Sequence, residues 1–318
     1  MSLIKSTNIS ELTNMLWMSS AFITLAERDG LEILCEEVNL THLQEKTNIP
    51  TPLLSALLDL LVEGKFVIKR GDYFRFSDEI IENIRNQIPK TLSLLRTNYG
   101  QAFNMVNTAR EDCLAMGWQH KQDYLLQAQG DNSERIVTHV FDQFEVVKSA
   151  IKKADATLLD VGAGVCAISI KACEEYPNLK VVGLEPADKP FELGKQNILF
   201  KKLKKRIDLR KIFLEDLRET EKYDVVWFPQ AFIPDEVFSK CLLSIKHALK
   251  KNGVLLTHVM STEKSGVGPS IARLKNVLFG GSLRSSQELL EALKNAGFYD
   301  LQTHEESGGT AIAGVINK

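Results

Sequence analysis

The chain has 318 residues, of which 44% are apolar and 25% are charged. This composition is typical of a globular protein with about two domains, and it excludes collagen-like, disordered and mucin-like chains. The formal net charge of −2 gives no overall attraction to nucleic acid or to an anionic membrane.

Cysteine and histidine usage narrows the class of protein further. The five cysteines are odd in number and form no CxxC pair, so we expect no disulfide framework and a reducing cytoplasm. The six histidines form neither an HxxxH nor an HExxH pair, so we expect no metal. The N-terminus does not resemble a signal peptide, and the apolar stretch 15–26 is shorter than the ~20 residues that cross a membrane.

The first 78 residues carry helical signals. Apolar residues recur at helical spacing over Met15–Leu34. A second helix is predicted from Thr41, which we expect to cap it, to the residues before Pro50. A third is predicted with Thr51 as its cap and Gly64 as its end.

Two short strands, Phe66–Ile68 and Tyr73–Phe76, flank a hairpin turn at residues 69–72. Helices followed by a two-stranded wing indicate a winged-helix domain. The helix over Thr51–Glu63, which would enter a major groove, has no Lys or Arg and is rich in leucine. A DNA-reading helix needs basic and amide side chains. We therefore expect this helix to be buried in a core or a dimer interface.

Residues 80–150 are predicted to be helical, with breaks at Pro89 and at Gly130–Asn132. We expect this connector to contribute Trp118, His120 and Phe144 to a substrate pocket, with packing as the alternative role of the aromatic residues and a surface role as that of His120. The predicted domains are therefore a winged-helix dimerisation domain (1–90), a helical connector (91–154) and a ligand-binding domain (155–318).

Strands and helices alternate after residue 155, which predicts an α/β fold with a parallel sheet covered on both faces. The expected strands are residues 157–161, 180–184, 209–214, 224–228, 254–259, 301–305 and 311–316. The expected helices are residues 167–175, 188–203 and 235–250, and one that begins at a Ser285–Glu288 capping box. Only a short loop joins the last two strands, so they must pair antiparallel.

In such a sheet the ligand binds at the carboxyl ends of the strands. The first strand ends in a turn in which Gly162 and Gly164 let the backbone approach a ligand. The second ends in Glu185, about 20 residues later, the position of a carboxylate that binds both ribose hydroxyls. The third ends in Asp216, which is suited to accept from an adenine amine. These strand ends predict a ligand that contains adenosine.

The glycine turn also satisfies a nicotinamide-binding fingerprint, so that cofactor stays open as an alternative. Three features favour S-adenosylmethionine. Asp160 lies just before the glycines, Asp216 ends the third strand, and the sheet closes with an antiparallel pair.

The motifs LLDVGAG, VVGLEP, LEDL, YDVVWFP, LKKNGVLL and GGSLRSSQELLEALKNAGF, behind a winged-helix domain, resemble the class I small-molecule O-methyltransferases. The resemblance implies a Rossmann-like sheet, S-adenosylmethionine as cofactor and an intertwined homodimer formed by the N-terminal domain. It also implies that Gly162 and Gly164 lie under the methionine part, that Glu185 holds the ribose, and that Asp216 and Leu217 flank the adenine.

Two departures from the family pattern affect the expected chemistry. The third glycine of the turn is Cys166, and Ala231 or Phe232 stands where plant-type members carry a catalytic His. Methyl transfer from a sulfonium needs a base only when the acceptor must lose a proton. The missing His therefore favours an N-, C- or acidic O-acceptor, or a base placed elsewhere.

His258, near the end of the fifth strand, is the best candidate for a substitute base, with a satisfied strand histidine as the alternative. We place Trp227 and Phe228 beside the cofactor, and Gln230 and Phe232 beside the acceptor, with core packing as the alternative role of the aromatic residues.

The sequence thus predicts a cytoplasmic, dimeric methyltransferase of secondary metabolism that acts on a small aromatic or polyketide-like metabolite. One alternative is an enzyme of this fold that catalyses a rearrangement, decarboxylation or hydroxylation instead. The other is a winged-helix regulator with a ligand-sensing second domain.

Overall fold

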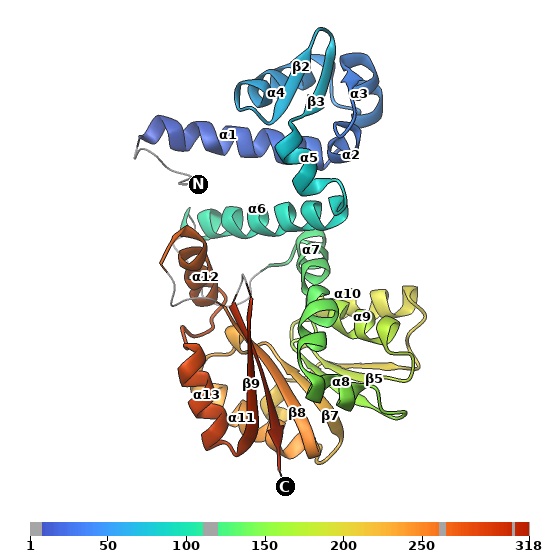
Figure 1. Cartoon of the computed structure of the whole chain (residues 1–318), viewed down its shortest axis with the longest axis vertical. Helices are drawn as coiled ribbons and strands as arrows, with labels where there is room; N and C mark the ends of the chain where they lie inside the picture. Colours follow the sequence, from blue (N-terminus) through green and yellow to red (C-terminus); the bar gives the residue numbers. More distant parts are fainter. Residues whose placement is uncertain (1–7, 111–119, 261–264, 307–308, 318) are drawn as a thin grey trace. The chain divides into compact units, whose positions relative to one another are not determined.

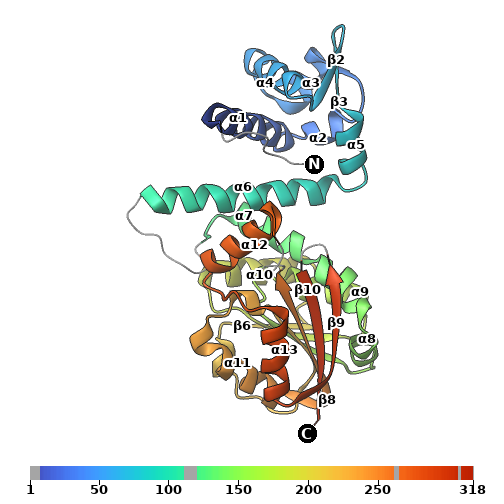
Figure 2. The ribbon, with the colours of Figure 1, turned by 60° about the vertical axis from the view of Figure 1, so that its left-hand side comes forward.

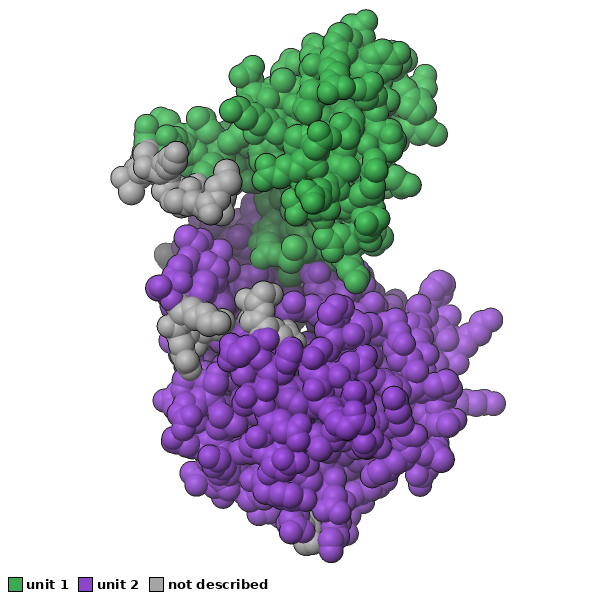
Figure 3. Space-filling model, in the orientation of Figure 1, with its two compact units in different colours: residues 1–99 green, residues 100–318 purple. Residues whose placement is uncertain are grey.

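A computed structural model of the chain describes residues 8–110, 120–260, 265–306 and 309–317 (Figure 1). The chain forms two compact units, residues 1–99 and 100–318 (Figure 3). The second unit therefore includes most of the predicted connector together with the predicted ligand-binding domain. We describe each unit by itself.

The first unit packs helices against a small antiparallel sheet. Its three strands, in the order β1-β3-β2, are Val38–Asn39, Tyr73–Phe76 and Val67–Arg70. The helices are α1 (Ile9–Ala26), α2 (Gly30–Ile33), α3 (Leu40–Thr47), α4 (Thr51–Glu63) and α5 (Asp78–Ile84). The predicted hairpin is confirmed, and its place after the helices is the one that a winged-helix domain requires.

Several predicted helix ends in this unit were wrong. The helix predicted to reach Leu34 stops at Ala26, and α2 is separate. Asn39, not Thr41, caps α3 by accepting a hydrogen bond from the His42 N–H at 2.8 Å. Helix α4 begins at Thr51 itself, after Pro50, without a side-chain cap. An Asn two residues earlier competes successfully with a Thr as a cap, and the residue pattern alone does not decide between them.

The predicted burial of α4 is confirmed. Leu54, Leu58 and Leu61 lie fully buried in the core of the first unit, while Leu53 on another side of the helix is half exposed. The apolar face of α4 thus packs inward, which is the arrangement of a structural helix.

Helix α6 (Ile88–Arg110) spans the boundary between the units, with Pro89 in its first turn. In the second unit it is followed by α7 (Asp123–Ser133), the π-helical turn η1 (Ile136–Val140), the 3₁₀ turn η2 (Phe141–Gln143) and α8 (Glu145–Ile151). The break predicted at Gly130–Asn132 was wrong, because these residues lie inside α7. A Cβ on Gly130 would lie 2.3 Å from Val165 Cγ2, so this glycine serves close packing against the glycine turn.

A seven-stranded sheet forms the centre of the second unit (Figure 2). Its strand order is β6-β5-β4-β7-β8-β10-β9, and only the pairings of β10 with β8 and β9 are antiparallel. The strands are β4 (Thr157–Val161), β5 (Lys180–Leu184), β6 (Ile207–Arg210), β7 (Tyr223–Phe228), β8 (Leu249–Met260), β9 (Phe298–Glu306) and β10 (Gly309–Ile316). The predicted mostly parallel, Rossmann-like sheet with an antiparallel last strand is confirmed.

Helices cover both faces of this sheet. One buried core contains residues of α8, α9 (Ala167–Glu175) and α10 (Asp188–Phe200), and the other contains residues of α11 (Asp235–Ala248) and α13 (Ser286–Asn295). The remaining elements are α12 (Val267–Leu278) and the 3₁₀ turns η3 (Leu214–Asp216) and η4 (Gln230–Phe232). The capping box predicted at Ser285 and Glu288 is present.

Several boundaries in the second unit differ from prediction by a few residues, among them the end of β6 and the end of α11. The strand expected over 209–214 is β6, which ends at Arg210, and residues 214–216 form η3 instead. Helix α11 ends at Ala248 rather than at Lys250, because β8 already begins at Leu249. Pairing with β7 starts at once, through Leu249 and Tyr223, so tertiary hydrogen bonding overrides the helical pattern there.

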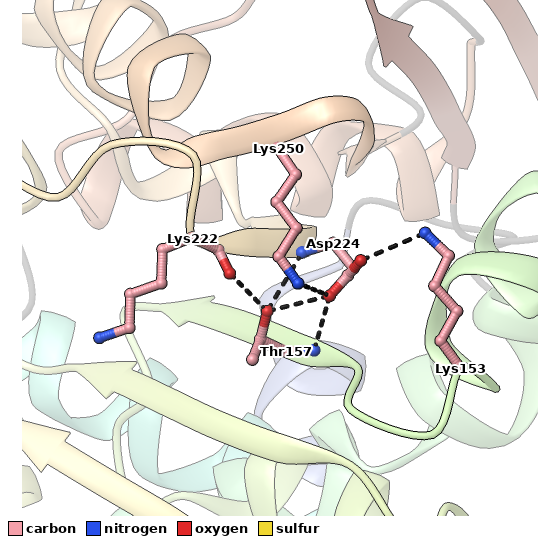
Figure 4. A network of polar contacts seen from close by, with 5 residues as sticks. All are labelled: Lys153, Thr157, Lys222, Asp224 and Lys250. Carbon is pink, nitrogen blue, oxygen red and sulfur yellow. Dashed lines mark hydrogen bonds and ion pairs between the residues drawn. The ribbon is translucent and has the colours of Figure 1, made fainter.

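A buried carboxylate connects the strands at the end of the sheet opposite the predicted ligand site (Figure 4). Asp224 on β7 accepts hydrogen bonds from Thr157 N at 2.9 Å, Lys250 Nζ at 2.7 Å and Lys153 Nζ at 3.2 Å. Burial by itself raises the pKa of Asp224, but these hydrogen bonds outweigh it and hold the pKa below its usual value. The network therefore joins the turn after α8 to β4, β7 and β8.

Replacing Asp224 by Asn should lower the free energy of unfolding by ~3 kcal/mol at pH 7, because two lysines then lose their buried partner. A lowered carboxyl pKa stabilises the fold above the unfolded value, near ~3.9, and this stabilisation is lost as the pH falls through the folded value. The difference between wild type and Asp224→Asn should therefore shrink in acid. Urea unfolding followed by circular dichroism measures it, with Glu145→Gln, which removes an exposed ion pair with Lys148, as the control. Equal losses in both variants would contradict the assignment.

Candidate cofactor and acceptor site

The glycine turn lies at the carboxyl end of β4 and leaves open space around it. Gly162 and Gly164 have φ of +65° and +55°, a conformation that costs glycine little. A Cβ on Gly162 would meet nothing nearer than Pro229 Cγ at 3.6 Å, and one on Gly164 nothing nearer than Gly162 O at 4.0 Å. Backbone conformation, not close packing, therefore requires these glycines, and the space beside them is available to a ligand.

Cys166 keeps the left-handed conformation of the glycine it replaces in the family pattern, with φ +65°. The Cβ in this conformation costs roughly 1–2 kcal/mol. The side chain is accommodated because the facing residue on α10 is Gly194, whose added Cβ would lie 2.9 Å from Cys166 Sγ. Burial, together with the nearby Asp160 and Glu185, raises the pKa of this thiol, so it is not a nucleophile.

Glu185 joins the carboxyl ends of β4 and β5. Its Oε2 accepts from the Gly164 N–H and its Oε1 from the Ala187 N–H, each at 2.9 Å. The residue is 8% exposed, and burial raises its pKa, partly offset by these two backbone hydrogen bonds. One carboxylate thus fixes the turn on one side and the start of α10 on the other, and its remaining lone pairs can accept from a diol.

Asp160 lies fully buried at the end of β4. Its Oδ2 accepts from Ser169 Oγ at 2.6 Å, whereas its Oδ1 has no hydrogen-bond partner. Burial raises the pKa of this carboxyl to about 7, despite the hydrogen bonds from Ser169. An unpartnered buried carboxylate oxygen beside an open turn fits a cationic ligand group.

The structure places the other predicted cofactor residues in different surroundings. Asp216 ends η3 with its side chain 61% exposed, and Leu217 is buried beside it. Trp227 and Phe228 belong to the cores on opposite faces of the sheet, since neighbouring residues of a strand alternate. Phe228 has no exposed surface, and its ring lies 6.0 Å from that of Phe238.

The segment after β7 carries the predicted acceptor residues. Phe232 in η4 stacks on Phe279 with ring centroids 5.7 Å apart, and Phe279 contacts His120 edge-on at 5.9 Å. The structure thus brings His120 and Phe232 together through Phe279. Sequence reasoning missed Phe279, although apolar residues at helical spacing in the preceding α12, namely Val267, Ile271 and Leu274, were an available signal.

Gly281 makes this arrangement possible. A Cβ on Gly281 would lie 1.6 Å from the carbonyl oxygen of Ala231, so the backbone of residue 281 rests directly on η4. Only glycine allows two backbones to approach so closely.

Gln230 was predicted to contact the acceptor, but its amide is used inside the protein. It is 1% exposed, and both ends of its amide are used within the protein. Its Nε2 donates to the His258 carbonyl at 3.3 Å, and its Oε1 accepts from Arg284 Nη1 at 2.9 Å. Arg284, which also pairs with Asp235 and lies over the Phe238 ring, was missed in the sequence. Its place directly before the Ser285 capping box was the available signal.

Of the two remaining acceptor candidates, the structure describes only Phe144. Phe144 is buried in a core, at the start of α8. Trp118 lies outside the described residues. Within the described ranges, no three His, Cys, Asp or Glu side chains gather as metal ligands, and none of the helices there is long and apolar enough to cross a membrane.

His258 is poorly suited to be a base. Its Nε2 is buried without a hydrogen-bond partner, and burial, assisted by the nearby Arg135, lowers its pKa to about 4. An imidazole with this pKa is neutral near pH 7 but takes up a proton only weakly.

With this geometry established, comparison with known proteins defines the class. Residues 152–298 match the sequence family described as "Methyltransferase domain". No curated protein matches the sequence significantly.

Among solved structures, an O-methyltransferase family protein from Burkholderia thailandensis is 14% identical with a TM-score of 0.74, over 100% of this chain and 99% of that one. The mitomycin 7-O-methyltransferase MmcR is 17% identical with a TM-score of 0.72, over 98% and 97%. Human N-acetylserotonin methyltransferase, solved in complex with S-adenosylmethionine, is 17% identical with a TM-score of 0.69, over 100% of both chains. The shared fold thus extends over both units.

Residues 152–298 match a methyltransferase domain, and the mostly parallel sheet of the second unit has the Rossmann-like fold of these structural neighbours. The family match over residues 152–298 and the fold of the whole chain confirm the predicted resemblance to the S-adenosylmethionine-dependent small-molecule O-methyltransferases. They also agree with S-adenosylmethionine as the cofactor, which the open turn, Glu185 and the unpartnered Asp160 oxygen fit.

The raised pKa of Asp160 predicts how the free energy of unfolding depends on pH. Because its pKa is raised to about 7, the folded state favours the neutral carboxyl, and stability is lost as the pH rises from ~4 through 7. Without ligand, the free energy of unfolding of the wild type should fall by about 1 kcal/mol more than that of Asp160→Asn between pH 6 and pH 8. Urea unfolding at both pH values measures this difference. Parallel pH dependence in the two proteins would show that Asp160 does not titrate in this range.

Proposed function

We propose that this protein transfers the methyl group of S-adenosylmethionine to a small aromatic or polyketide-like metabolite in secondary metabolism. The observation that carries the proposal is the open glycine turn, held against Glu185 by the Gly164 N–H. This pairing of an open turn with a fixed carboxylate supports binding of an adenosyl ligand at the carboxyl ends of β4 and β5.

Each proposed cofactor contact uses a feature already described. Glu185 accepts from the ribose hydroxyls, and Gly162 and Gly164 make room for the methionine part. Asp160 faces the cationic group of that part with its unpartnered oxygen. Asp216 and Leu217 flank the adenine, as the family resemblance implies. Trp227, the less completely buried of the two strand-end aromatics, and Phe228 support the site from the sheet.

These residues favour catalysis by positioning the methyl acceptor relative to the cofactor. When bound, the sulfonium supplies an activated methyl group, so the protein must hold the acceptor in line and exclude water. His258 is a weak base, and its pKa of about 4 favours an acceptor that is nucleophilic without deprotonation. We therefore propose an N-, C- or acidic O-acceptor bound against Phe232, Phe279 and His120.

Removing the Glu185 carboxylate should weaken S-adenosylmethionine binding. We expect Glu185→Ala to bind ~10–100-fold less tightly by calorimetry, because charge-assisted hydrogen bonds to the ligand are lost and two backbone N–H groups lose their acceptor. Glu185→Gln keeps the shape but removes the charge and one of the two accepting oxygens. Glu192→Ala, which removes an exposed ion pair with Lys195, is the matched control. Unchanged affinity in a folded Glu185→Ala protein would contradict the cofactor site.

Turnover identifies the reaction class in the same preparation. Incubation with S-adenosylmethionine and a panel of aromatic and polyketide-like metabolites should release S-adenosylhomocysteine, detected by chromatography. Conversion of a metabolite without S-adenosylhomocysteine would favour the rearrangement, decarboxylation or hydroxylation that the missing His leaves open. Tight binding of duplex DNA at low salt, without turnover, would favour the regulator.

We also propose that the protein is a cytoplasmic homodimer that associates through its N-terminal domain. Helix α1 exposes a row of large apolar residues, of which Trp17 is 69% exposed; the others are Ile9, Leu12, Met15 and Leu16. Such a contiguous apolar surface is typical of an interface. The cysteines among the described residues are free, which agrees with a reducing compartment.

Negative charges introduced on α1 should dissociate the proposed dimer. We expect Leu16→Glu combined with Trp17→Glu to sediment as a monomer in analytical ultracentrifugation, where the wild type sediments as a dimer, because a buried unpaired charge opposes association. Leu53→Glu, at a half-exposed leucine of α4 in the same unit, is the control and should stay dimeric. A wild-type monomer, or a dimer that survives both charges, would overturn the proposed interface.

A further inference from the structure

A side chain of α10 holds the glycine turn at a second point, in addition to Glu185. Asn197 Nδ2 donates to the Val165 carbonyl at 2.9 Å. The N–H of the same peptide unit, that of Cys166, donates to the Ala163 carbonyl at 2.8 Å. The peptide unit that joins Val165 to Cys166 therefore has a hydrogen bond at each of its two polar ends.

A second amide fixes the orientation of Asn197. Gln127 on α7 donates through Nε2 to Asn197 Oδ1 at 3.2 Å, and its Oε1 accepts from Asn197 Nδ2 at 3.0 Å. A backbone carbonyl can only accept, so the Asn197 atom that faces Val165 must be the NH₂ group. Both hydrogens of this group are then used, one by Val165 and one by Gln127.

Apolar side chains of the same two helices enclose Val165. Leu126 of α7 and Leu193 of α10 form one buried cluster with Val165, which is 3% exposed. Leu126, Gln127 and Gly130, whose added Cβ would lie 2.3 Å from Val165 Cγ2, are spaced so that they share one face of α7. This face of the predicted connector therefore contacts the glycine turn and α10.

We propose that Asn197 and Gln127 are positioning residues for the cofactor: they hold the Val165 carbonyl and thereby keep the turn in the conformation that receives the methionine part. This inference rests on the proposed function, and it gives the connector helix α7 a role in cofactor binding. Glu185 would contact the ribose itself, whereas the amide pair would act only through the turn.

The two kinds of contact should differ in which ligands they affect. Without the amide pair, the turn must be ordered when the ligand binds, and this cost lowers affinity. The loss should concern ligands that extend over the turn, and it should spare ligands that end at the ribose.

Calorimetry on the full chain tests this difference with two probes, S-adenosylhomocysteine, which extends over the turn, and adenosine, which ends at the ribose. We expect Asn197→Leu, a change of similar size, to bind S-adenosylhomocysteine ~5–20-fold less tightly and adenosine with nearly unchanged affinity. Equal weakening of both probes, or unchanged affinity for both, would overturn the proposal.

A double-mutant cycle tests whether Gln127 acts through Asn197. Gln127→Leu alone should weaken S-adenosylhomocysteine binding by ~2–5-fold, because the Asn197 amide loses the partner that orients it. The same change should have no further effect in Asn197→Leu. Gln129→Leu serves as control, because it makes the same substitution on α7 but removes a hydrogen bond from Gln101 on α6. Additive losses, or an equal loss in Gln129→Leu, would contradict the positioning role.

Hydrogen exchange reports on the turn without any ligand. In mass spectrometry of the unliganded protein, a peptide that covers residues 160–168 should exchange ~5-fold faster in Asn197→Leu than in the wild type. A peptide from β10 in the same sample should keep the wild-type rate, which separates a looser turn from a less stable fold. Unchanged exchange of the turn, or the same acceleration in both peptides, would contradict the proposal.

The outcomes separate this inference from the proposed function. Equal S-adenosylhomocysteine affinity in the wild type and Asn197→Leu would leave the proposed function standing and remove the role of Asn197. A wild type that binds neither probe would remove the proposed function and the role in cofactor binding, while hydrogen exchange would still show whether Asn197 holds the turn.

Discussion

The two hydrogen bonds accepted by the Glu185 carboxylate are the constraint on which the proposed site depends. They tie the turn after β4 to the start of α10, so that the ends of two adjacent parallel strands have one fixed geometry. A carboxylate buried to this degree is stable because backbone N–H groups satisfy it. The same oxygen atoms that order these strand ends are those proposed to bind the ribose, so the site is arranged before the ligand arrives and the ordering cost of binding is small.

Much of the fold could be predicted from the sequence because the hydrophobic periodicity and the turn residues indicate the same element boundaries there. Helix α9 has the predicted bounds, and strands β4 and β5 do as well, because buried parallel strands are short apolar runs bounded by turn residues. The antiparallel end of the sheet followed from the short loop before β10. Errors occurred where local signals compete, as with Asn39 against Thr41, and where tertiary pairing decides, as at the start of β8.

The site was predictable to a smaller extent. Strand ends identified Gly162, Gly164 and Glu185 because topology alone brings them together. The proposed acceptor side depends on Phe279 and Arg284, which come from elements distant in sequence from η4. Gln230 was expected to meet a ligand, yet both ends of its amide are used inside the protein. Only side-chain contacts distinguish a ligand-binding amide from a structural one.

The contact between Gly281 and Ala231 limits how this acceptor wall can diversify. Since the backbone at residue 281 rests on a carbonyl oxygen, neither a larger residue there nor a shifted loop is compatible with the packing. The rings at positions 232 and 279, in contrast, meet through their side chains. Acceptor preference in homologous enzymes, or in redesigned versions of this one, should therefore change by exchange of aromatic for aliphatic or smaller side chains on a constant backbone, and not by loop insertion.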